Sequence, residues 1–256
     1  MRALVTGAGA RLGAAMAEAL AGDGHDVAVH YATSEDGAEA VAGRIRGLGR
    51  RAATLRADLL DLDAAEALVG RAAEALGGPL TVLVNNASIF EHDDLAGATR
   101  EGWDRHMRSN LQAPFVLIQA FAAQAPAPGT DGEPLATGLV VNMVDQRVLK
   151  LTPEFMTYTL AKAGLWTLTR TAAQALAPGI RVNAIGPGPT LRGHRQSEAH
   201  FAAQRAGTVL GRGADPADVV AALRYLLGAR AVTGQLICVD GGQHLGWRTP
   251  DVQGVE

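Results

Sequence analysis

Short runs of β-branched and aliphatic residues alternate with longer alanine-rich segments, and this alternation restricts the fold more than any other feature. Strands are predicted at 2–6, 27–31, 51–55, 80–84, 139–144, 180–185 and 235–239, and helices at 11–22, 35–47, 62–76, 100–124, 154–177 and 216–227. Strands this short and apolar, separated by helices, indicate a parallel sheet covered on both faces. Right-handed crossovers then give an α/β fold, a doubly wound, mostly parallel sheet (Rossmann fold) of about seven strands with helices on both faces.

The chain of 256 residues predicts a single domain spanning 1–256. A stretch rich in proline and glycine at 126–138 reads as an insertion, because predicted strands continue on both sides of it. We expect the loop at 187–207 to close over a substrate. The tail beyond Gly242 shows no clear periodicity.

Charge and composition favour a cytoplasmic globular protein, either an enzyme or a binding protein. The net charge of -3 gives no reason to expect a nucleic acid or a membrane surface as partner. No apolar stretch approaches the length of a bilayer span, and the chain opens directly on a strand rather than on a signal peptide. The lone Cys238 cannot form an internal disulfide, which fits a reducing compartment.

A glycine-rich turn, TGAGARLG at 6–13, joins the first predicted strand to the first helix. Its glycines permit a tight turn and let backbone N–H groups approach a pyrophosphate at the positive end of the helix. A purely structural turn is the alternative, but the position after the first strand favours a dinucleotide site.

The end of the second strand, at 30–34, carries no acidic residue of the kind that binds the ribose 2′-hydroxyl of NAD. Glu35 comes later and opens the next helix, where a negative charge suits the dipole. Arg11, Thr33 and Ser34 together suit a 2′-phosphate, which favours NADPH/NADP+. For Arg11 the alternative is a solvated helix residue.

Polar residues follow two further strands. Asp58, just past the third strand, could accept a hydrogen bond from the adenine amino group. The segment 85–88 follows the fourth strand, where the carboxyl-end crevice of such a sheet lies. For Asn86, a role in tying loops together is favoured over cofactor contact.

Tyr158 and Lys162 lie four positions apart on a predicted helix and therefore share one face. A nearby ammonium favours the phenolate, so we expect it to lower the pKa of the tyrosine from about 10. Such a pair can deliver or remove a proton. Asp145 stands at the end of the fifth strand, and Asn110 sits mid-helix, where asparagine has no propensity reason to be.

These pieces together resemble the short-chain dehydrogenase/reductase family over nearly the whole chain: the glycine turn, Asn85-Asn86-Ala87, Asn110, Tyr158-x-x-x-Lys162, and Arg181-Val182-Asn183 leading to Pro187-Gly188. The resemblance implies that Lys162 also holds the nicotinamide ribose. It further implies that Asn110 supports a water relaying protons to Lys162, and that 186–188 flank the carboxamide. Adding the glycine turn and the strand ends, the expected cofactor contacts are Gly7, Arg11, Leu12, Gly13, His30, Tyr31, Thr33, Ser34, Asp58, Leu59, Asn86, Ala87, Ser88, Tyr158, Lys162 and Gly188.

Two residues depart from the usual family pattern. Arg11 stands where the turn usually has a glycine, and Asp145 stands where the catalytic serine is usual. An ionised aspartate accepts hydrogen bonds and cannot donate one. It is therefore a poor partner for a ketone oxygen and a better one for a nitrogen-rich ring, or for a tyrosine that protonates ring nitrogen.

Both departures resemble the pteridine reductase branch, which this chain also matches in His30-Tyr31, in Asn85 to Phe90 and in Met143-Val144-Asp145. By this resemblance Phe90 stacks on one face of a pterin, whose other face meets the nicotinamide. Arg11 would serve both cofactor phosphate and pterin, and Ser88 would contact either. Core packing of Phe90 and a capping role for Asp145 are the alternatives. The expected substrate contacts are Arg11, Ser88, Phe90, Asp145 and Tyr158.

The leading hypothesis is an NADPH-dependent oxidoreductase that reduces a C=N bond of a pterin or dihydropterin, such as dihydromonapterin or dihydrofolate. Tyr158 and Asp145 would supply the proton. The alternative enzyme is a ketoreductase acting on a 3-oxoacyl thioester or a sugar. A non-catalytic NADP(H)-binding sensor is the alternative of another class, and the presence of Asn110, Tyr158 and Lys162 argues against it.

The resemblance also implies a homo-oligomer, a tetramer assembled through the helices at 100–124 and 154–177. Both are alanine-rich and apolar on more than one face, which fits burial against a partner. The loop at 187–207 holds His194, Arg195 and His200. We expect no metal site there, since nothing nearby completes a ligand set.

Overall fold

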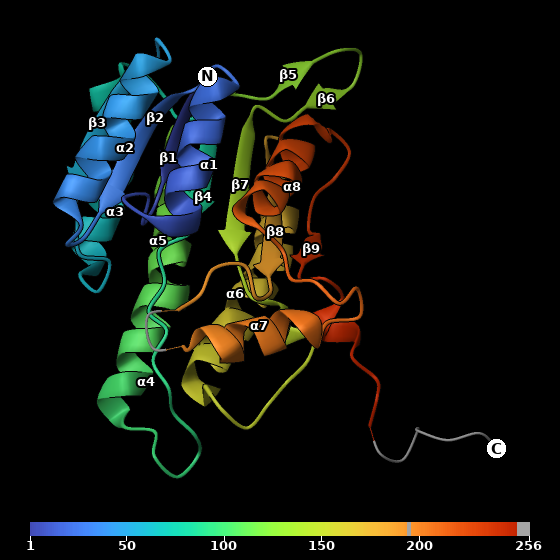
Figure 1. The fold of residues 1–256 in the computed structure, drawn as a ribbon. Coiled ribbons are helices and arrows are strands. Elements are labelled where there is room, and N and C mark those ends of the chain that lie inside the picture. Colours follow the sequence, from blue (N-terminus) through green and yellow to red (C-terminus); the bar gives the residue numbers. More distant parts are fainter. Residues whose placement is uncertain (194–195, 250–256) are drawn as a thin grey trace.

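The computed structural model describes residues 1–193 and 196–249 and contains a seven-stranded parallel sheet in the order β3-β2-β1-β4-β7-β8-β9 (Figure 1). Its strands are β1 (Arg2–Val5), β2 (Asp26–Tyr31), β3 (Ala52–Arg56), β4 (Val82–Asn85), β7 (Gly138–Met143), β8 (Ile180–Pro187) and β9 (Leu236–Val239). The predicted doubly wound α/β fold is confirmed.

Helices cover both faces of this sheet. On one face lie α1 (Arg11–Gly22), α2 (Glu35–Gly47) and α8 (Pro216–Gly228), and on the other α3 (Leu62–Leu76), α5 (Ala113–Gln124) and α6 (Met156–Ala175). Side chains of β1 alternate between the two cores, because successive strand residues point to opposite faces. Ala3 and Val5 pack in the first core and Leu4 packs in the second.

The single helix predicted at 100–124 is divided into three parts. It consists of α4 (Arg100–Met107), a π-helical turn at Arg108–Gln112, and α5. Pro114 lies in the first turn of α5, where its missing N–H cannot continue the α-helical ladder of the preceding segment. Asn110 therefore lies within a π-helical turn, a feature frequent at functional sites.

Two segments predicted as loops contain additional structure. The insertion at 126–138 forms a short antiparallel hairpin of β5 (Gly129–Thr130) and β6 (Pro134–Leu135). The loop at 187–207 contains α7 (Glu198–Ala206), a helix of nine residues that buries none of them. His200 lies in α7, whereas His194 and Arg195 lie outside the described residues.

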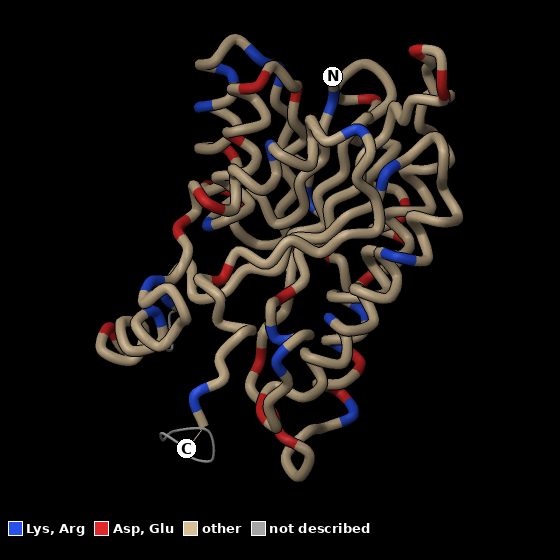
Figure 2. Tube along the Cα trace, turned by 90° about the vertical axis from the view of Figure 1, so that its right-hand side faces the viewer, with Lys and Arg blue, Asp and Glu red and all other residues tan. Residues whose placement is uncertain are grey.

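Basic and acidic residues are interspersed along the chain (Figure 2). None of the described helices has the length and apolar character needed to span a bilayer. Among residues 1–193 and 196–249, no three His, Cys, Asp or Glu side chains gather as metal ligands.

Candidate active site

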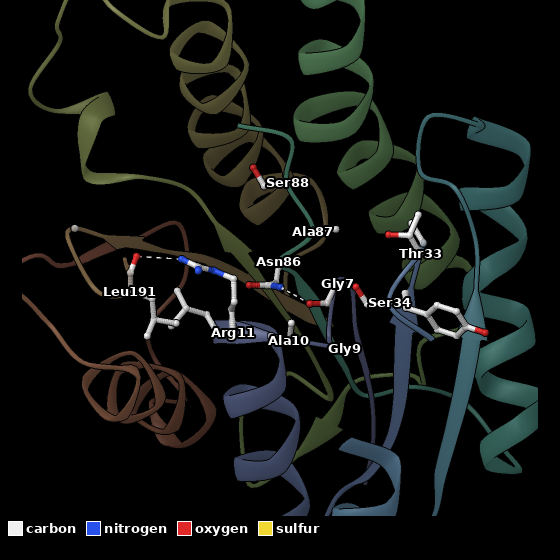
Figure 3. A pocket seen from close by; sticks show the side chains of 15 residues that line it. Gly7, Gly9, Ala10, Arg11, Thr33, Ser34, Asn86, Ala87, Ser88 and Leu191 are labelled. Carbon is white, nitrogen blue, oxygen red and sulfur yellow. Dashed lines mark hydrogen bonds between the residues drawn. The ribbon is translucent and has the colours of Figure 1, made fainter. Parts of the chain in front are cut away.

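The candidate site lies at the carboxyl edge of the sheet, where the order of the strands reverses. From β1 the chain winds outward to β2 and β3, then returns to place β4 on the other side of β1. Such a reversal leaves a crevice that receives ligands in doubly wound folds. A cavity of about 440 Å³ opens there (Figure 3), lined by Gly7, Gly9, Ala10, Arg11, Leu12, Gly13, Tyr31, Ala32, Thr33, Ser34, Asn86, Ala87, Ser88, Gly188 and Leu191.

The glycine turn forms the floor of this cavity and tolerates no side chain at its closest points. Gly7 has a φ of 61°, and a Cβ on Gly13 would lie 2.3 Å from the carbonyl oxygen of Gly7. The side-chain amide of Asn86 donates to the carbonyl oxygens of Thr6 and Gly7 at 2.9 and 3.2 Å. Asn86 therefore has the tying role that its sequence position favoured.

His30 lies beneath the turn and does not line the cavity. Its Nδ1 accepts a 3.0 Å hydrogen bond from the backbone N–H of Gly7, so Nε2 carries the proton and donates to the carbonyl of Ala57 at 3.1 Å. Burial lowers the pKa of His30 to about 4, which keeps the ring neutral. Because both nitrogens are used within the protein, the prediction of direct cofactor contact is corrected: His30 holds the turn.

The distal end of the cavity fits the predicted preference for a 2′-phosphate. Tyr31, Thr33 and Ser34 line it, and none of the described lining residues is acidic. Asp58 and Leu59 do not line the cavity. Asp58 is exposed and accepts from the backbone N–H of Leu60 at 2.9 Å, and the side chain of Leu59 packs in the core. A cofactor contact by Leu59 would therefore come from its backbone.

Arg11 adopts a positive φ of 54°, the left-handed region that favours glycine. Its guanidinium donates to the carbonyl oxygens of Leu191 and Arg192, both at 3.0 Å, and so joins the glycine turn to the loop at 187–207 (Figure 3). Sequence reasoning did not find this connection. The predicted contacts of Arg11 with cofactor phosphate and substrate stay predictions.

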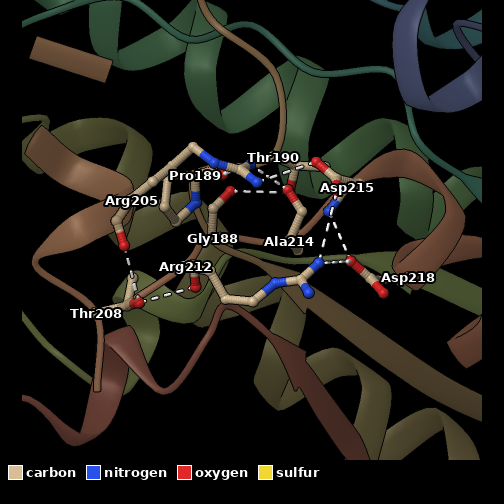
Figure 4. A network of polar contacts seen from close by, with 9 residues as sticks. All are labelled: Gly188, Pro189, Thr190, Arg205, Thr208, Arg212, Ala214, Asp215 and Asp218. Atoms are coloured by element: carbon tan, nitrogen blue, oxygen red, sulfur yellow. Dashed lines mark hydrogen bonds and ion pairs between the residues drawn. The ribbon is translucent and has the colours of Figure 1, made fainter. Parts of the chain in front are cut away.

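Arg205 of α7 joins the start of the same loop to the segment that precedes α8 (Figure 4). Its guanidinium donates to the carbonyl oxygens of Pro189 and Ala214 and pairs with the carboxylate of Asp215 at 3.1 Å. These partners lie nine or more positions away along the chain, so no local sequence signal marked Arg205.

A second cavity, of about 300 Å³, adjoins the first and shares Arg11, Leu12, Asn86, Ser88 and Gly188 with it. Its other lining residues come from the ends of β7 and β8, from α6 and from the segment after β4. These are Phe90, Met143, Val144, Asp145, Tyr158, Lys162 and Pro187. The fold thus brings together every predicted substrate contact.

Tyr158 and Asp145 form the polar centre of the second cavity. The tyrosine hydroxyl donates to Oδ2 of Asp145 at 3.0 Å. Burial raises the pKa of Asp145. Burial, followed by the negative charge of Asp145, raises the pKa of Tyr158 well above its ordinary value. The expectation of a lowered pKa for Tyr158 is therefore wrong, because burial, and after it the charge of the aspartate that replaces the usual serine, disfavours the phenolate.

Lys162 is 2% exposed and donates to the carbonyl oxygen of Met143 at 2.7 Å. Its Nζ lies 5.7 Å from the centroid of the Tyr158 ring. Burial lowers the pKa of Lys162 to about 8, against the opposing influence of Asp145. The ammonium is thus charged at neutral pH but close to losing its proton.

Asn110 and His106 hold the segment that carries Ser88 and Phe90. The side-chain amide of Asn110 is fully buried, donating to the carbonyl of Ile89 at 2.8 Å and accepting from its N–H at 2.9 Å. His106, also buried, accepts from the N–H of Glu91 at 3.2 Å. Asn110 thus has a positioning role besides the water relay, which stays a prediction; no sequence signal pointed to His106.

Known proteins match this chain over almost its full length. The family model described as enoyl-(acyl carrier protein) reductase matches residues 7–244. An L-rhamnose 1-dehydrogenase (NAD(P)(+)) from Sphingomonas sp. (strain SKA58) is 32% identical, covering 94% of this chain and 95% of the relative. A 3-oxoacyl-[acyl-carrier-protein] reductase FabG from Staphylococcus aureus (strain Mu50) is also 32% identical, covering 95% and 98%.

Solved structures agree with this fold. FolM alternative dihydrofolate reductase 1 from Brucella suis, in complex with NADP, has a TM-score of 0.91 and 44% identity and covers 98% of both chains. A short-chain dehydrogenase from Burkholderia cenocepacia J2315, also with NADP, has a TM-score of 0.86 and 35% identity, covering 94% of this chain and 97% of its own. The protein belongs to the short-chain dehydrogenase/reductase family.

Proposed function

We propose that this protein is an NADPH-dependent reductase of a pterin or dihydropterin C=N bond, with dihydromonapterin and dihydrofolate as candidate substrates. The observation that carries the proposal is the hydrogen bond from Tyr158 to a carboxylate, Asp145, at the position where the family usually has a serine. The 44% identity to the FolM alternative dihydrofolate reductase of Brucella suis supports it.

The first cavity fits a phosphorylated dinucleotide. The glycine turn presents backbone at the start of α1, and the distal end offers hydroxyl groups without an acidic residue among the described lining. Solved relatives of similar fold contain NADP. When bound, the cofactor supplies a hydride. Gly188 lines both cavities and Lys162 lines the second, and the nicotinamide would be held where the two cavities adjoin.

The residues of the second cavity would hold and transfer the proton that the substrate nitrogen receives. Tyr158 keeps its proton at neutral pH, because its pKa is raised, and so can supply a proton to a ring nitrogen as the neighbouring carbon is reduced. The raised pKa makes the phenol a weaker acid, so the transfer depends on the groups around it. Asp145 holds the phenol in place and, with its own raised pKa, can share that proton. The Lys162 ammonium offsets the negative charge left on the pair after transfer.

Turnover measurements test the proposal. NADPH oxidation would be followed with dihydromonapterin, dihydrofolate, a 3-oxoacyl thioester and an aldose, and repeated with NADH. We expect pterin turnover, and a kcat/KM for NADPH at least about tenfold above that for NADH, since one lost charge-assisted contact costs that much. Efficient turnover of the thioester or aldose with no pterin turnover would contradict the proposal.

Carbonyl reduction is the second candidate, favoured by the sugar dehydrogenase and 3-oxoacyl reductase among the relatives. Asp145 argues against it, because a carboxylate cannot donate to a ketone oxygen. A non-catalytic NADP(H) sensor is the third. Binding of NADPH without its oxidation by any pterin or carbonyl substrate would favour the sensor. A homotetramer and a cytoplasmic location stay predictions.

A further inference from the structure

Among the described residues, Arg11 and Phe155 are the non-glycine residues with positive φ, and both lie at the candidate site. Phe155 has φ 56° and ψ 45° and immediately precedes α6, three residues before Tyr158. A bulky residue in this region costs about 1–3 kcal/mol and persists only where the surroundings impose it. The surroundings of Phe155 therefore impose its conformation.

The ring of Phe155 stacks on the ring of Phe90. Their centroids are 4.4 Å apart and their planes differ by 6°. Phe90 lines the second cavity and is 50% exposed, with its ring 4.7 Å from that of Tyr158 at 72°. The guanidinium carbon of Arg147 lies 5.0 Å from the Phe155 centroid. Phe155 thus links the cavity wall to the residue two positions beyond Asp145.

The backbone of Phe155 is fixed on both sides. Its N–H donates to the carbonyl of Asp93 at 2.7 Å, and its carbonyl accepts from the N–H and hydroxyl of Thr159 at 2.9 and 2.7 Å. The carboxylate of Asp93 in turn accepts from the N–H of Thr157 at 3.3 Å. The segment that carries Phe90 and the start of α6 are therefore joined, and the backbone from which the Phe155 ring projects is held in place.

We propose that Phe155 is a positioning residue, which sets the tilt of Phe90 so that a flat substrate ring stacks on it beside Tyr158. The inference rests on the proposed function and adds a residue that determines specificity. A half-exposed phenylalanine without support would lose rotamer freedom when substrate binds, which weakens affinity. Supported on one face by Phe155, Phe90 is ordered before the substrate arrives.

Three substitutions separate this role from helix capping. Phe155→Leu removes the stack and keeps the unfavourable φ, Phe155→Gly removes the stack and relieves it, and Phe155→Tyr keeps the stack. We expect Phe155→Leu and Phe155→Gly both to raise the KM for dihydropterin by about tenfold, the range of one aromatic pair. In both variants the KM for NADPH and the kcat at saturating pterin should stay within about twofold of the unaltered enzyme. Phe155→Tyr should keep the pterin KM of the unaltered enzyme.

Thermal unfolding provides the structural comparison: Phe155→Gly should melt no lower than Phe155→Leu, although both weaken pterin binding. Tyr225→Leu, an exposed aromatic on α8 away from the site, is the control and should leave every parameter unchanged. An unaltered pterin KM in Phe155→Leu would overturn the inference, as would parallel losses in kcat, NADPH binding and melting temperature. Absence of pterin turnover by the unsubstituted enzyme would instead overturn the proposed function itself, and this inference with it.

Discussion

The hydroxyl of Tyr158 donates a 3.0 Å hydrogen bond to Oδ2 of Asp145, whose Oδ1 accepts one of 2.8 Å from the backbone N–H of Arg147. Both carboxylate oxygens therefore have fixed partners, and the group is held facing the tyrosine. The usual serine would offer a hydrogen-bond donor here, whereas the carboxylate offers an acceptor with a raised pKa. This reversal is the basis for expecting a nitrogen heterocycle rather than a ketone.

Replacing Asp145 should reverse the preference for substrate. We expect Asp145→Ser to lower kcat/KM for dihydropterin by about 100-fold, the contribution of one proton-transfer group, and to raise ketone turnover. Asp145→Asn keeps the shape, loses the titratable group, and should show the same pterin loss without the gain on ketones. Steady-state kinetics on both substrates measure this. Pterin turnover that survives in Asp145→Ser, alongside good ketone turnover by the unaltered enzyme, would exclude the pterin function.

The lowered pKa of Lys162 predicts that activity falls at alkaline pH. Burial lowers its pKa from 10.5 to about 8, so kcat/KM should fall as the pH rises through about 8 and the ammonium loses its charge. Lys162→Arg keeps the charge over this range and should move the alkaline limit upward, even if kcat itself falls. A pH–rate profile for both enzymes tests this. An identical alkaline limit in the two would assign that limit to another group.

The same shift predicts how stability depends on pH. Because the folded-state pKa of Lys162 lies below its ordinary value of 10.5, the unfolded chain binds more protons between about pH 8 and 10.5. The contribution of Lys162 to the free energy of unfolding therefore rises with pH across that window. Lys162→Met should flatten this rise in denaturant titrations, and an unchanged pH slope in this variant would contradict the assignment.

Assembly into a homotetramer through the predicted helical faces can be tested at exposed apolar residues. Trp103 on α4, Phe115 on α5 and Leu160 on α6 are 43%, 47% and 47% exposed. Phe115→Glu would place a charge on this face, and we expect a smaller species by light scattering with an intact circular dichroism spectrum. Leu48→Glu, 54% exposed after α2, is the matched control. A tetramer that persists in Phe115→Glu would place the interface elsewhere.

Most of the sheet was predictable because each strand is a short apolar run bounded by a turn. The edge where Arg11, Asp145 and Tyr158 meet was also predictable, since carboxyl ends of parallel strands converge there. The pKa of Tyr158 was predicted in the wrong direction. The spacing between Tyr158 and Lys162 is visible in the sequence. The burial of the Tyr158 hydroxyl and its approach to Asp145, which raise the pKa, arise only on folding.

Residues whose role depends on contacts with distant parts of the chain could not be predicted. His30 reads as part of a cofactor motif, yet its ring bonds the backbone at Gly7 and Ala57. Arg205 and Phe155 gain their roles from Pro189 and Phe90, which no sequence spacing connects to them. Helix α7, nine residues that bury no side chain in the core, was predicted as part of a loop.

Substitution of Asn110 tests whether this residue positions the segment of Ser88 and Phe90 or supports a proton relay. Asn110→Ala leaves the backbone N–H and carbonyl of Ile89 without their side-chain partner, which should lower the free energy of unfolding by about 1–3 kcal/mol. If positioning dominates, KM for pterin rises because Ser88 and Phe90 move, while kcat changes little. A fall in kcat with unchanged pterin KM, together with a larger solvent isotope effect, would instead favour the relay.

Arg11 combines backbone strain with contacts to the loop, and a glycine substitution separates the two. Arg11→Gly removes a positive φ that costs about 1–2 kcal/mol and also removes both hydrogen bonds to the carbonyls of Leu191 and Arg192. Because the guanidinium is exposed, those bonds stabilise the fold little. We expect the melting temperature to hold or rise, the loop at 187–207 to be cleaved faster in limited proteolysis, and KM for NADPH to increase.

Arg11→Lys retains the charge but not the forked geometry that reaches two carbonyls. It should recover part of the NADPH affinity, through attraction to phosphate, while the loop stays sensitive to protease. If Arg11→Gly instead lowers the melting temperature and leaves both NADPH binding and proteolysis unchanged, Arg11 serves the fold alone. The side chain of Arg11 would then stabilise the fold by more than the cost of its positive φ, with no role at the site.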